Sequence, residues 1–168
     1  MNTSPWYSRM SDNELNDAIC ARNSQLFNLR AYKVGIIGAG AIGSFTASSL
    51  TRSGIGRLAI FDNDSVAPEN IGVQDYMISQ VDLNKAIAIK RTCMGINPTT
   101  RIYACPMNVE YDYPNGNLPN RKVMDTDIIN SLDHCDIIVL AVDSMEARLE
   151  IMDIITTNCE VSTGVSKL

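Results

Sequence analysis

The chain has 168 residues, of which 45% are hydrophobic and 20% are charged, a composition typical of one globular domain that can bury a core without disulfides or metal. A net charge of −5 and the lack of a Lys/Arg cluster interleaved with aromatics argue against a nucleic-acid partner. No apolar run approaches the roughly 18 residues of a membrane span, and the N-terminus carries neither a secretory signal nor an Arg-rich transit peptide. We therefore expect a cytoplasmic protein with no membrane partner.

The cysteines and the single histidine give no sign of a metal or redox site. The five cysteines are odd in number, far apart and without a C-x-x-C pair, so we expect reduced and mostly buried thiols. His134 has no second histidine near it and is assigned no role. The cysteines are Cys20, Cys93, Cys105, Cys135 and Cys159.

The predicted elements begin with a helical arm. Residues 11–30 open on Ser11-Asp12-Asn13-Glu14, a helix N-cap pattern, and continue with loosely helical apolar spacing. We therefore divide the chain into an N-terminal helical arm, residues 1–30, and a Rossmann-like nucleotide-binding domain, residues 31–168. Because this domain is short, truncation remains an open alternative.

Strands and helices then alternate along the domain. This alternation predicts an α/β fold, a Rossmann-like, doubly wound and mostly parallel sheet with helices on both faces. The predicted strands cover residues 33–37, 57–61, 101–107, 136–142 and 160–162. The predicted helices cover residues 41–53, 79–94, 125–134 and 144–158, and residues 108–124 are a connection rich in turn formers.

A G-x-G-x-x-G pattern lies between the first strand and the helix after it. Gly38 permits the tight turn, Gly40 removes a side chain that would hold phosphate away, and Gly43 lets the helix pack closely on the strand. The helix N-terminus adds free N–H groups and a partial positive charge. The alternative is a glycine turn that only packs.

A carboxylate at the end of the next strand favours the nucleotide interpretation. Asp62 follows Gly38 by 24 residues, where an acidic side chain accepts the ribose hydroxyls. The same charge would repel a 2′-phosphate, so NADP is disfavoured. ATP and NAD both remain open at this point.

An ordered series of motifs resembles the ThiF/MoeB/HesA family over about residues 11–165. These are Rossmann-type enzymes related to ubiquitin-activating enzymes, which adenylate the C-terminal glycine of a ubiquitin-like or sulfur-carrier protein. The series comprises the glycine loop, Gly54-Ile55-Gly56-Arg57-Leu58, Asp62-Asn63-Asp64-Ser65-Val66, Glu69-Asn70-Ile71 with Gln74, Asn84-Lys85-Ala86, Ile96-Asn97-Pro98, Asp136-Ile137-Ile138-Val139, Asp143-Ser144 and Arg148.

The resemblance implies a site for ATP and Mg²⁺. It assigns Lys85 and Asn70 to the triphosphate and Asp143 to the magnesium ion, so that Lys85 and Asp143 are the candidate catalytic residues. Asp64 and Gln74 are expected beside the nucleotide, with the three glycines and Asp62. The partner implied is a ubiquitin-like or sulfur-carrier protein, and the assembly a homodimer or a heterodimer with a related chain.

Simpler roles remain open for each of these side chains. Lys85 can be a solvated lysine, Asn70 a turn residue, Asp143 a helix cap and Asp64 a stabiliser of its own turn. Arg148 is expected to form a structural ion pair rather than a catalytic contact.

Two positions depart from the family pattern. Val73 and Ser24 stand where members usually carry arginines that act on the triphosphate, and Arg22 is displaced by two positions from the second of them. Cys159 lies near a predicted helix end and is a poor thioester nucleophile. We therefore keep three hypotheses: an adenylating enzyme, a catalytically weakened relative that binds a nucleotide or a partner, and an NAD-dependent oxidoreductase, for which this length leaves no substrate domain.

Overall fold

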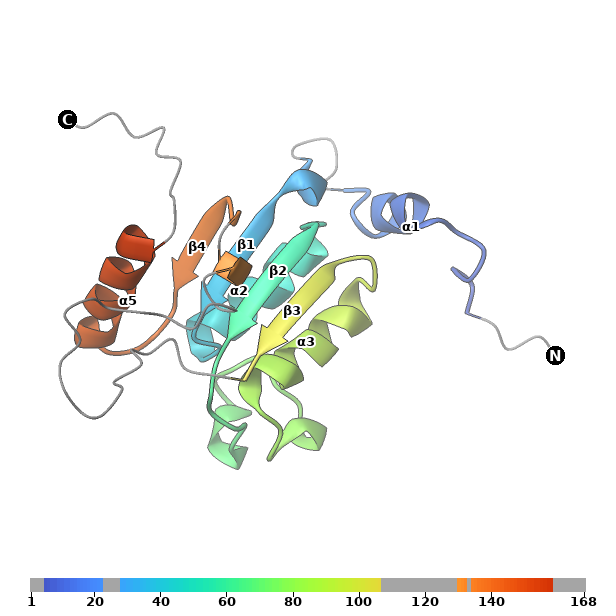
Figure 1. The fold of residues 1–168 in the computed structure, drawn as a ribbon. Coiled ribbons are helices and arrows are strands. Elements are labelled where there is room, and N and C mark those ends of the chain that lie inside the picture. Colours follow the sequence, from blue (N-terminus) through green and yellow to red (C-terminus); the bar gives the residue numbers. More distant parts are fainter. Residues whose placement is uncertain (1–4, 23–27, 107–129, 133, 159–168) are drawn as a thin grey trace.

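The computed structural model describes residues 5–22, 28–106, 130–132 and 134–158 (Figure 1). The predicted connection at 108–124, most of the helix predicted at 125–134 and the strand predicted at 160–162 lie outside these ranges. Within them, no helix is long and apolar enough to cross a membrane.

The described strands form one parallel sheet in the order β3-β2-β1-β4. Short apolar runs build its two central strands, because a parallel strand covered on both faces buries both sets of side chains. The two edge strands stay partly exposed. The chain enters at β1 in the middle, moves outward to β3 and then returns to the other side of β1. The strands are β1 (Lys33–Ile37), β2 (Arg57–Phe61), β3 (Arg101–Cys105) and β4 (Ile137–Leu140).

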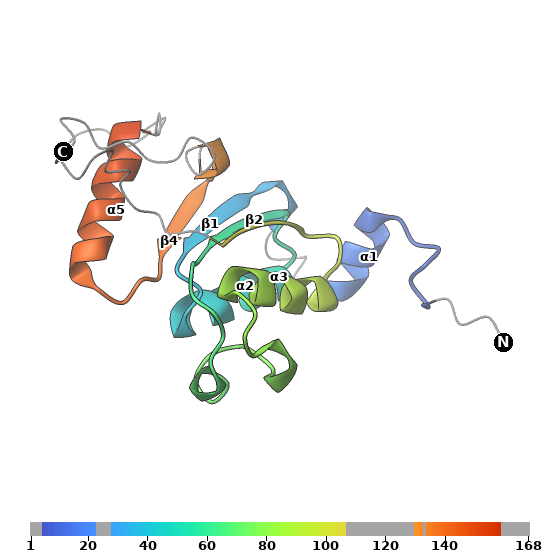
Figure 2. The same ribbon diagram turned by 60° about the horizontal axis from the view of Figure 1, so that its bottom comes forward.

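Helices cover both faces of this sheet (Figure 2). α2 (Ala41–Arg52) and α3 (Lys85–Ile96) pack on one face, and α5 (Met145–Asn158) lies on the other. The sheet order reverses between β1 and β4, and such a switch point opens a crevice at the carboxyl ends of the strands. The α/β Rossmann-like prediction is confirmed.

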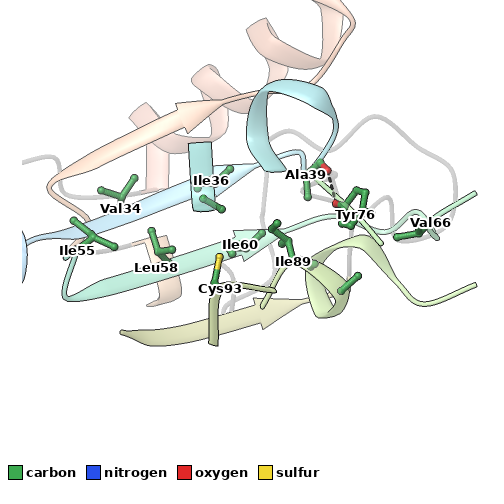
Figure 3. Close-up of a cluster of buried hydrophobic side chains, with 13 residues drawn as sticks. Val34, Ile36, Ala39, Ile55, Leu58, Ile60, Val66, Tyr76, Ile89 and Cys93 are labelled. Carbon is green, nitrogen blue, oxygen red and sulfur yellow. Dashed lines mark hydrogen bonds between the residues drawn. The ribbon is translucent and has the colours of Figure 1, made fainter. Parts of the chain in front are cut away.

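Two apolar clusters, one on each face, hold the layers together. Figure 3 shows the larger cluster, in which Ile36 and Ile60 of the sheet meet Ile89 of α3, each with no exposed surface. Burying one such side chain contributes roughly 1.5–3 kcal/mol. The second cluster places Phe61 under Ile151 of α5. The floor of the crevice is therefore closely packed on both faces of the sheet.

The helical arm is capped as predicted. α1 (Asp12–Ile19) begins after Ser11, whose hydroxyl accepts the Glu14 N–H while the Glu14 carboxylate accepts the Ser11 N–H. A short 3₁₀ turn, η1 (Leu29–Ala31), then leads into β1.

The start of the helix predicted at 79–94 was wrong. α3 begins at Lys85, and residues before it form two short 3₁₀ turns, η2 (Pro68–Asn70) and η3 (Ile78–Gln80). Asp82 has a φ of 67°, a conformation that ends any helix passing through it. Asn84 then caps α3, its side chain accepting the Ile87 N–H. The apolar residues between 78 and 83 have a spacing similar to that of a helix, which is why the sequence predicted a helix start that is too early.

The thiols of the described cysteines are mostly buried, as predicted. Cys20, Cys93 and Cys105 are buried and Cys135 is half-buried. Burial raises the pKa of Cys93 and of Cys20 above that of an ordinary thiol. Cys159 lies outside the described residues.

Candidate functional site

A pocket of about 680 Å³ opens at the carboxyl ends of β1, β2 and β4. It lies at the switch point of the sheet, where open α/β folds bind ligands. The glycine loop, the turn after β2, the start of α3 and the start of α5 all contribute to it. Its polar and charged lining comes from Asp62, Asn63, Asp64, Gln74, Lys85, Asp143 and Arg148.

The three glycines of the loop differ in the space around them. Gly38 has a φ of +91°, and a Cβ on it would lie 2.8 Å from the Ala141 carbonyl oxygen. A Cβ on Gly43 would overlap the Gly38 carbonyl oxygen, so this glycine permits the close packing of α2 on β1. A Cβ on Gly40 would meet no atom within 4 Å, and Gly40 lines the pocket. The space beside Gly40 is thus available to a ligand.

The N-terminus of α2 faces the same space. Gly40 is its N-cap residue and has no side chain to cap it. The first helical bond runs from the Ser44 N–H to the Gly40 carbonyl at 2.9 Å, so the amides before Ser44 have no carbonyl one turn back. Ala41 and Ile42, which carry two of these amides, line the pocket. This arrangement suits an anion such as a phosphate.

Asp62 ties the glycine loop to the turn after β2. Its Oδ2 accepts the Ala39 N–H at 2.6 Å, and its Oδ1 accepts the Asp64 N–H at 2.8 Å. Each carboxylate oxygen has a second lone pair, so Asp62 can still accept ribose hydroxyls.

Lys85 is not a solvated lysine. It is the first residue of α3, only 9% of it is exposed, and its Nζ lies 3.0 Å from the Asp64 Oδ2. Asp64 itself is 62% exposed at its side chain, so one partner of the ion pair reaches solvent. The pair holds the ammonium group at the pocket wall. Asp64 takes part in its own turn through its backbone N–H, which donates to the Asp62 Oδ1, whereas its side chain pairs with Lys85.

Asn84 connects the start of α3 to the turn after β2. The sequence points to this residue only through the motif that contains it. Its Nδ2 donates to the carbonyls of Asp62, at 2.8 Å, and Asp64, at 3.1 Å. The position directly before a helix is where an Asn side chain caps it, and that signal could have identified Asn84.

Tyr76 was missed by the sequence reasoning. Its hydroxyl donates to the Ala39 carbonyl at 2.5 Å (Figure 3). The same hydroxyl lies 3.4 Å from the Lys85 carbonyl oxygen. Only 6% of Tyr76 is exposed. Burial, followed by the charge of Asp62, raises the pKa of Tyr76 far above its ordinary value. No pattern in the sequence marks a lone tyrosine in a turn region as a partner of a glycine loop.

Asp143 and Arg148 supply the wall formed by β4 and α5. Ser144 caps α5, because its hydroxyl accepts the Ala147 N–H at 3.0 Å; Asp143 lines the pocket. The Arg148 Nε donates to the Val142 carbonyl at 2.8 Å. Among the residues that the structure describes, Arg148 forms no ion pair, contrary to expectation, and its guanidinium is a second cation beside Lys85.

Asn70 and Gln74 lie on one segment but have different surroundings. The Asn70 Oδ1 accepts the Ala67 N–H at 2.9 Å, and Asn70 is not among the described residues that line the pocket. This is the turn role kept open for it. Gln74 does line the pocket, and its buried Oε1 accepts no hydrogen bond from the residues that the structure describes. Val73, at the family's arginine position, is 62% exposed.

The side chains present fit a weakly held magnesium ion rather than a protein cage. No cluster of three His, Cys, Asp or Glu side chains occurs in the part of the chain that the structure describes. Mg²⁺ at nucleotide sites commonly takes one or two carboxylates and completes its shell with phosphate and water. Asp143, exposed at the end of β4, can supply such a carboxylate.

Comparison with known proteins now assigns the family. The sequence model of the ThiF family matches residues 14–160. The chain belongs to the ThiF family. It is 35% identical over 123 residues to the ubiquitin-like modifier-activating enzyme 5 of Drosophila persimilis, an alignment that covers 73% of this chain and 32% of the relative. The enzyme of the same name from Gallus gallus is 32% identical over 130 residues, covering 73% and 30%.

This ThiF-family chain thus spans about a third of the length of these curated relatives. Solved structures share its fold. The E. coli tRNA N6-threonylcarbamoyladenosine dehydratase TcdA matches with a TM-score of 0.69 at 21% identity, over 89% of this chain and 59% of that one. The same enzyme in complex with ATP matches with a TM-score of 0.68 at 20% identity, over 84% and 56%.

Proposed function

We propose that this chain binds ATP with magnesium and adenylates the C-terminus of a ubiquitin-like or sulfur-carrier protein. The observation that carries the proposal is the convergence of the open Gly40, the N-terminus of α2, Asp62 and Lys85 on one pocket. Family membership supports it, as do the names of the relatives, which activate ubiquitin-like modifiers. An ATP complex of a structural neighbour supports the nucleotide.

Each wall of the pocket takes one part of the nucleotide in this proposal. Asp62 accepts the ribose hydroxyls, and the amides at the start of α2 hold a phosphate. Lys85 and Arg148, which both line the pocket, neutralise phosphate charge. Gln74 offers its buried oxygen to a donor on the ligand, and Asp143 takes the magnesium that accompanies ATP. Asn70 would reach a phosphate only by giving up its bond to Ala67.

The chemistry requires no nucleophile from the protein. A carboxylate oxygen of the acceptor attacks the α-phosphorus, the bond to the β-phosphate oxygen breaks, and pyrophosphate leaves with the electron pair. Positioning and charge neutralisation supply the rate enhancement in such transfers. The chain contributes the pocket and its two cations, and the acceptor contributes the attacking group. A second copy, or a related chain, completes the assembly.

The runner-up is a catalytically weakened relative, and Val73 favours it. An exposed apolar side chain stands where the family resemblance places an arginine, and losing one such charge costs on the order of a hundredfold in rate. Ser24, the other departure, lies outside the described residues. Binding would then survive while turnover is slow.

Two measurements separate the hypotheses. Calorimetric titration with ATP and magnesium, and in parallel with NAD, tests the ligand class; tighter binding of NAD would contradict the proposal. Exchange of labelled pyrophosphate into ATP, with candidate ubiquitin-like proteins ending in glycine, tests adenylation. Binding of ATP without exchange would favour the weakened relative.

Replacing Val73 by arginine tests the weakened relative directly. We expect Val73→Arg to raise pyrophosphate exchange by at least about tenfold if a missing cation limits the rate. Val73→Gln is the matched control, because it adds a long polar side chain without charge. Equal exchange in the two variants would show that this position does not act on the phosphates.

A further inference from the structure

Ala39, which lies between Gly38 and Gly40 of the glycine loop, is hydrogen-bonded through both its N–H and its carbonyl oxygen. The Ala39 N–H donates to the Asp62 Oδ2, and the Ala39 carbonyl accepts from the Tyr76 hydroxyl. Ala39 has no exposed surface. The first contact comes from a carboxylate that the fingerprint predicts, whereas the second comes from a buried phenol that no motif predicts (Figure 3).

The hydrogen bond at the Ala39 carbonyl also sets the direction of the Gly40 N–H. The Ala39 carbonyl and the Gly40 N–H belong to one peptide unit, which is planar and trans, as no cis bond occurs in the described chain. In a trans peptide the C=O and N–H point in opposite directions. A hydroxyl that holds the carbonyl toward the buried side therefore turns the Gly40 N–H away from it. Gly40 lines the pocket, so this amide is placed for an anion there.

The same hydroxyl reaches the start of α3. Its second contact, 3.4 Å from the Lys85 carbonyl, belongs to the residue whose ammonium group stands at the pocket wall. Tyr76 thereby spans the two elements that supply a phosphate-binding amide and a cation. Its raised pKa keeps the hydroxyl protonated, and hence a donor, throughout the neutral range.

The segment bearing Tyr76 is itself anchored to α2. The neighbouring Asp75 N–H donates to the Ser44 Oγ at 3.0 Å, and Ser44 is fully buried in the first turn of α2. The segment with Asp75 and Tyr76 therefore makes two contacts with the glycine loop and α2. Asp75 contacts Ser44 in the first turn of α2, and Tyr76 contacts Ala39 in the loop before it.

We propose that Tyr76 is a positioning residue for the phosphate groups of the bound nucleotide, acting through the Ala39–Gly40 peptide. The proposal rests on the nucleotide binding proposed above. A positioning role and a purely packing role predict different results. If Tyr76 positions the loop, removing its hydroxyl frees one peptide unit beside the phosphates and leaves the ribose contact at Asp62 in place.

The test measures the affinities of adenosine, AMP and ATP with magnesium for the full chain and for Tyr76→Phe by NMR titration. We expect Tyr76→Phe to bind ATP and AMP about three- to tenfold more weakly, the effect of one lost hydrogen bond, and adenosine unchanged. Tyr32→Phe is the matched control, because Tyr32 is 47% exposed and follows η1, away from the pocket. It should leave all three affinities unchanged.

Thermal unfolding of the same variants identifies a folding defect. If Tyr76→Phe does not fold, Ser44→Ala replaces it, because loss of the Asp75 contact loosens the same turn while the phenol stays in place. That variant should show a smaller loss with the same selectivity for phosphate.

Each other outcome overturns the inference. Equal weakening of adenosine and ATP would make Tyr76 a purely structural residue, and unchanged ATP affinity would mean that the hydroxyl does not position the loop. Failure of the unmodified chain to bind any of the three would instead overturn the proposed function, so the two failures are distinguishable.

Discussion

Two side-chain amides at opposite ends of the sheet show how polar groups divide between structure and function. At the amino ends of the strands, Asn97 has no exposed surface and every polar atom of its side chain is engaged. Its Nδ2 donates to the Asn16 Oδ1 at 3.1 Å, and its Oδ1 accepts the hydroxyl of Thr99 at 2.8 Å and the Thr99 N–H at 3.2 Å. Arg30 closes this network with a bond of 2.7 Å to the same hydroxyl.

At the carboxyl ends, Gln74 is left incomplete. Its Oε1 is buried and accepts no hydrogen bond from any described part of the chain, although Gln74 lines a pocket with Lys85 and Arg148. A buried acceptor without a donor costs about 1–3 kcal/mol in the unliganded protein. The network around Asn97 connects α1 to the segment before β3, whereas the pocket contains one buried acceptor, the Gln74 Oε1, that no described residue satisfies. Under the proposed function, we expect this oxygen to accept a donor from the nucleotide.

The largest expected effect of a single change is at Asn97. Asn97→Leu removes three hydrogen bonds, so that Asn16 and Thr99 each lose a buried partner, and we expect a loss of roughly 3 kcal/mol in the free energy of unfolding. For a chain of this size the melting temperature should fall by about 6–12 °C. Below that temperature ATP affinity should be unchanged within twofold. Thermal melting and calorimetry measure the two quantities, and a loss of affinity with stability preserved would reverse the roles assigned to the two ends.

The sequence predicted the carboxyl end of the sheet better than its surroundings. The glycine loop and Asp62 were predictable because backbone conformation and steric access allow few alternatives there. Lys85 and Asp143 depended on the family resemblance, and the pocket brings both together with Gln74. The start of α3 was missed because Asp82 breaks the helix through a left-handed backbone conformation, which its residue type does not dictate.

Contacts between distant segments could not be predicted. The hydroxyl of Tyr76 meets the Ala39 carbonyl across 37 residues, and Asn97 meets Asn16 across 81. Neither pair shares a periodicity or a motif, so only the packed fold reveals it. Arg148 was expected to pair with a carboxylate but donates to the Val142 carbonyl, because the turn from β4 into α5 brings that oxygen within reach.

The next effect concerns the cation at the pocket. Lys85→Ala should weaken ATP binding by roughly thirtyfold, about 2 kcal/mol, because a charge-assisted contact to phosphate is lost. The melting temperature should change little, since its partner Asp64 is largely exposed and such pairs contribute about 0–1 kcal/mol. Arg91→Ala, on an exposed position of the same helix, is the control. If both variants bind ATP alike, Lys85 does not contact the phosphates.

The smallest expected effect has the opposite sign for stability and compares the two amides directly. Gln74→Met keeps the length of the side chain while removing an acceptor that has no donor in the unliganded protein, so the free energy of unfolding should stay constant or rise by up to about 1 kcal/mol. ATP affinity should fall by about three- to tenfold, since the ligand loses the oxygen that it would satisfy. The comparison with Asn97→Leu is informative because both changes remove a buried amide: one should lower stability and preserve binding, and the other should preserve stability and lower binding. Thermal melting with and without ATP and magnesium gives both readouts from one preparation. A fall in stability as large as that of Asn97→Leu would show that Gln74 has a protein partner, and the distinction between the two ends of the sheet would then no longer hold.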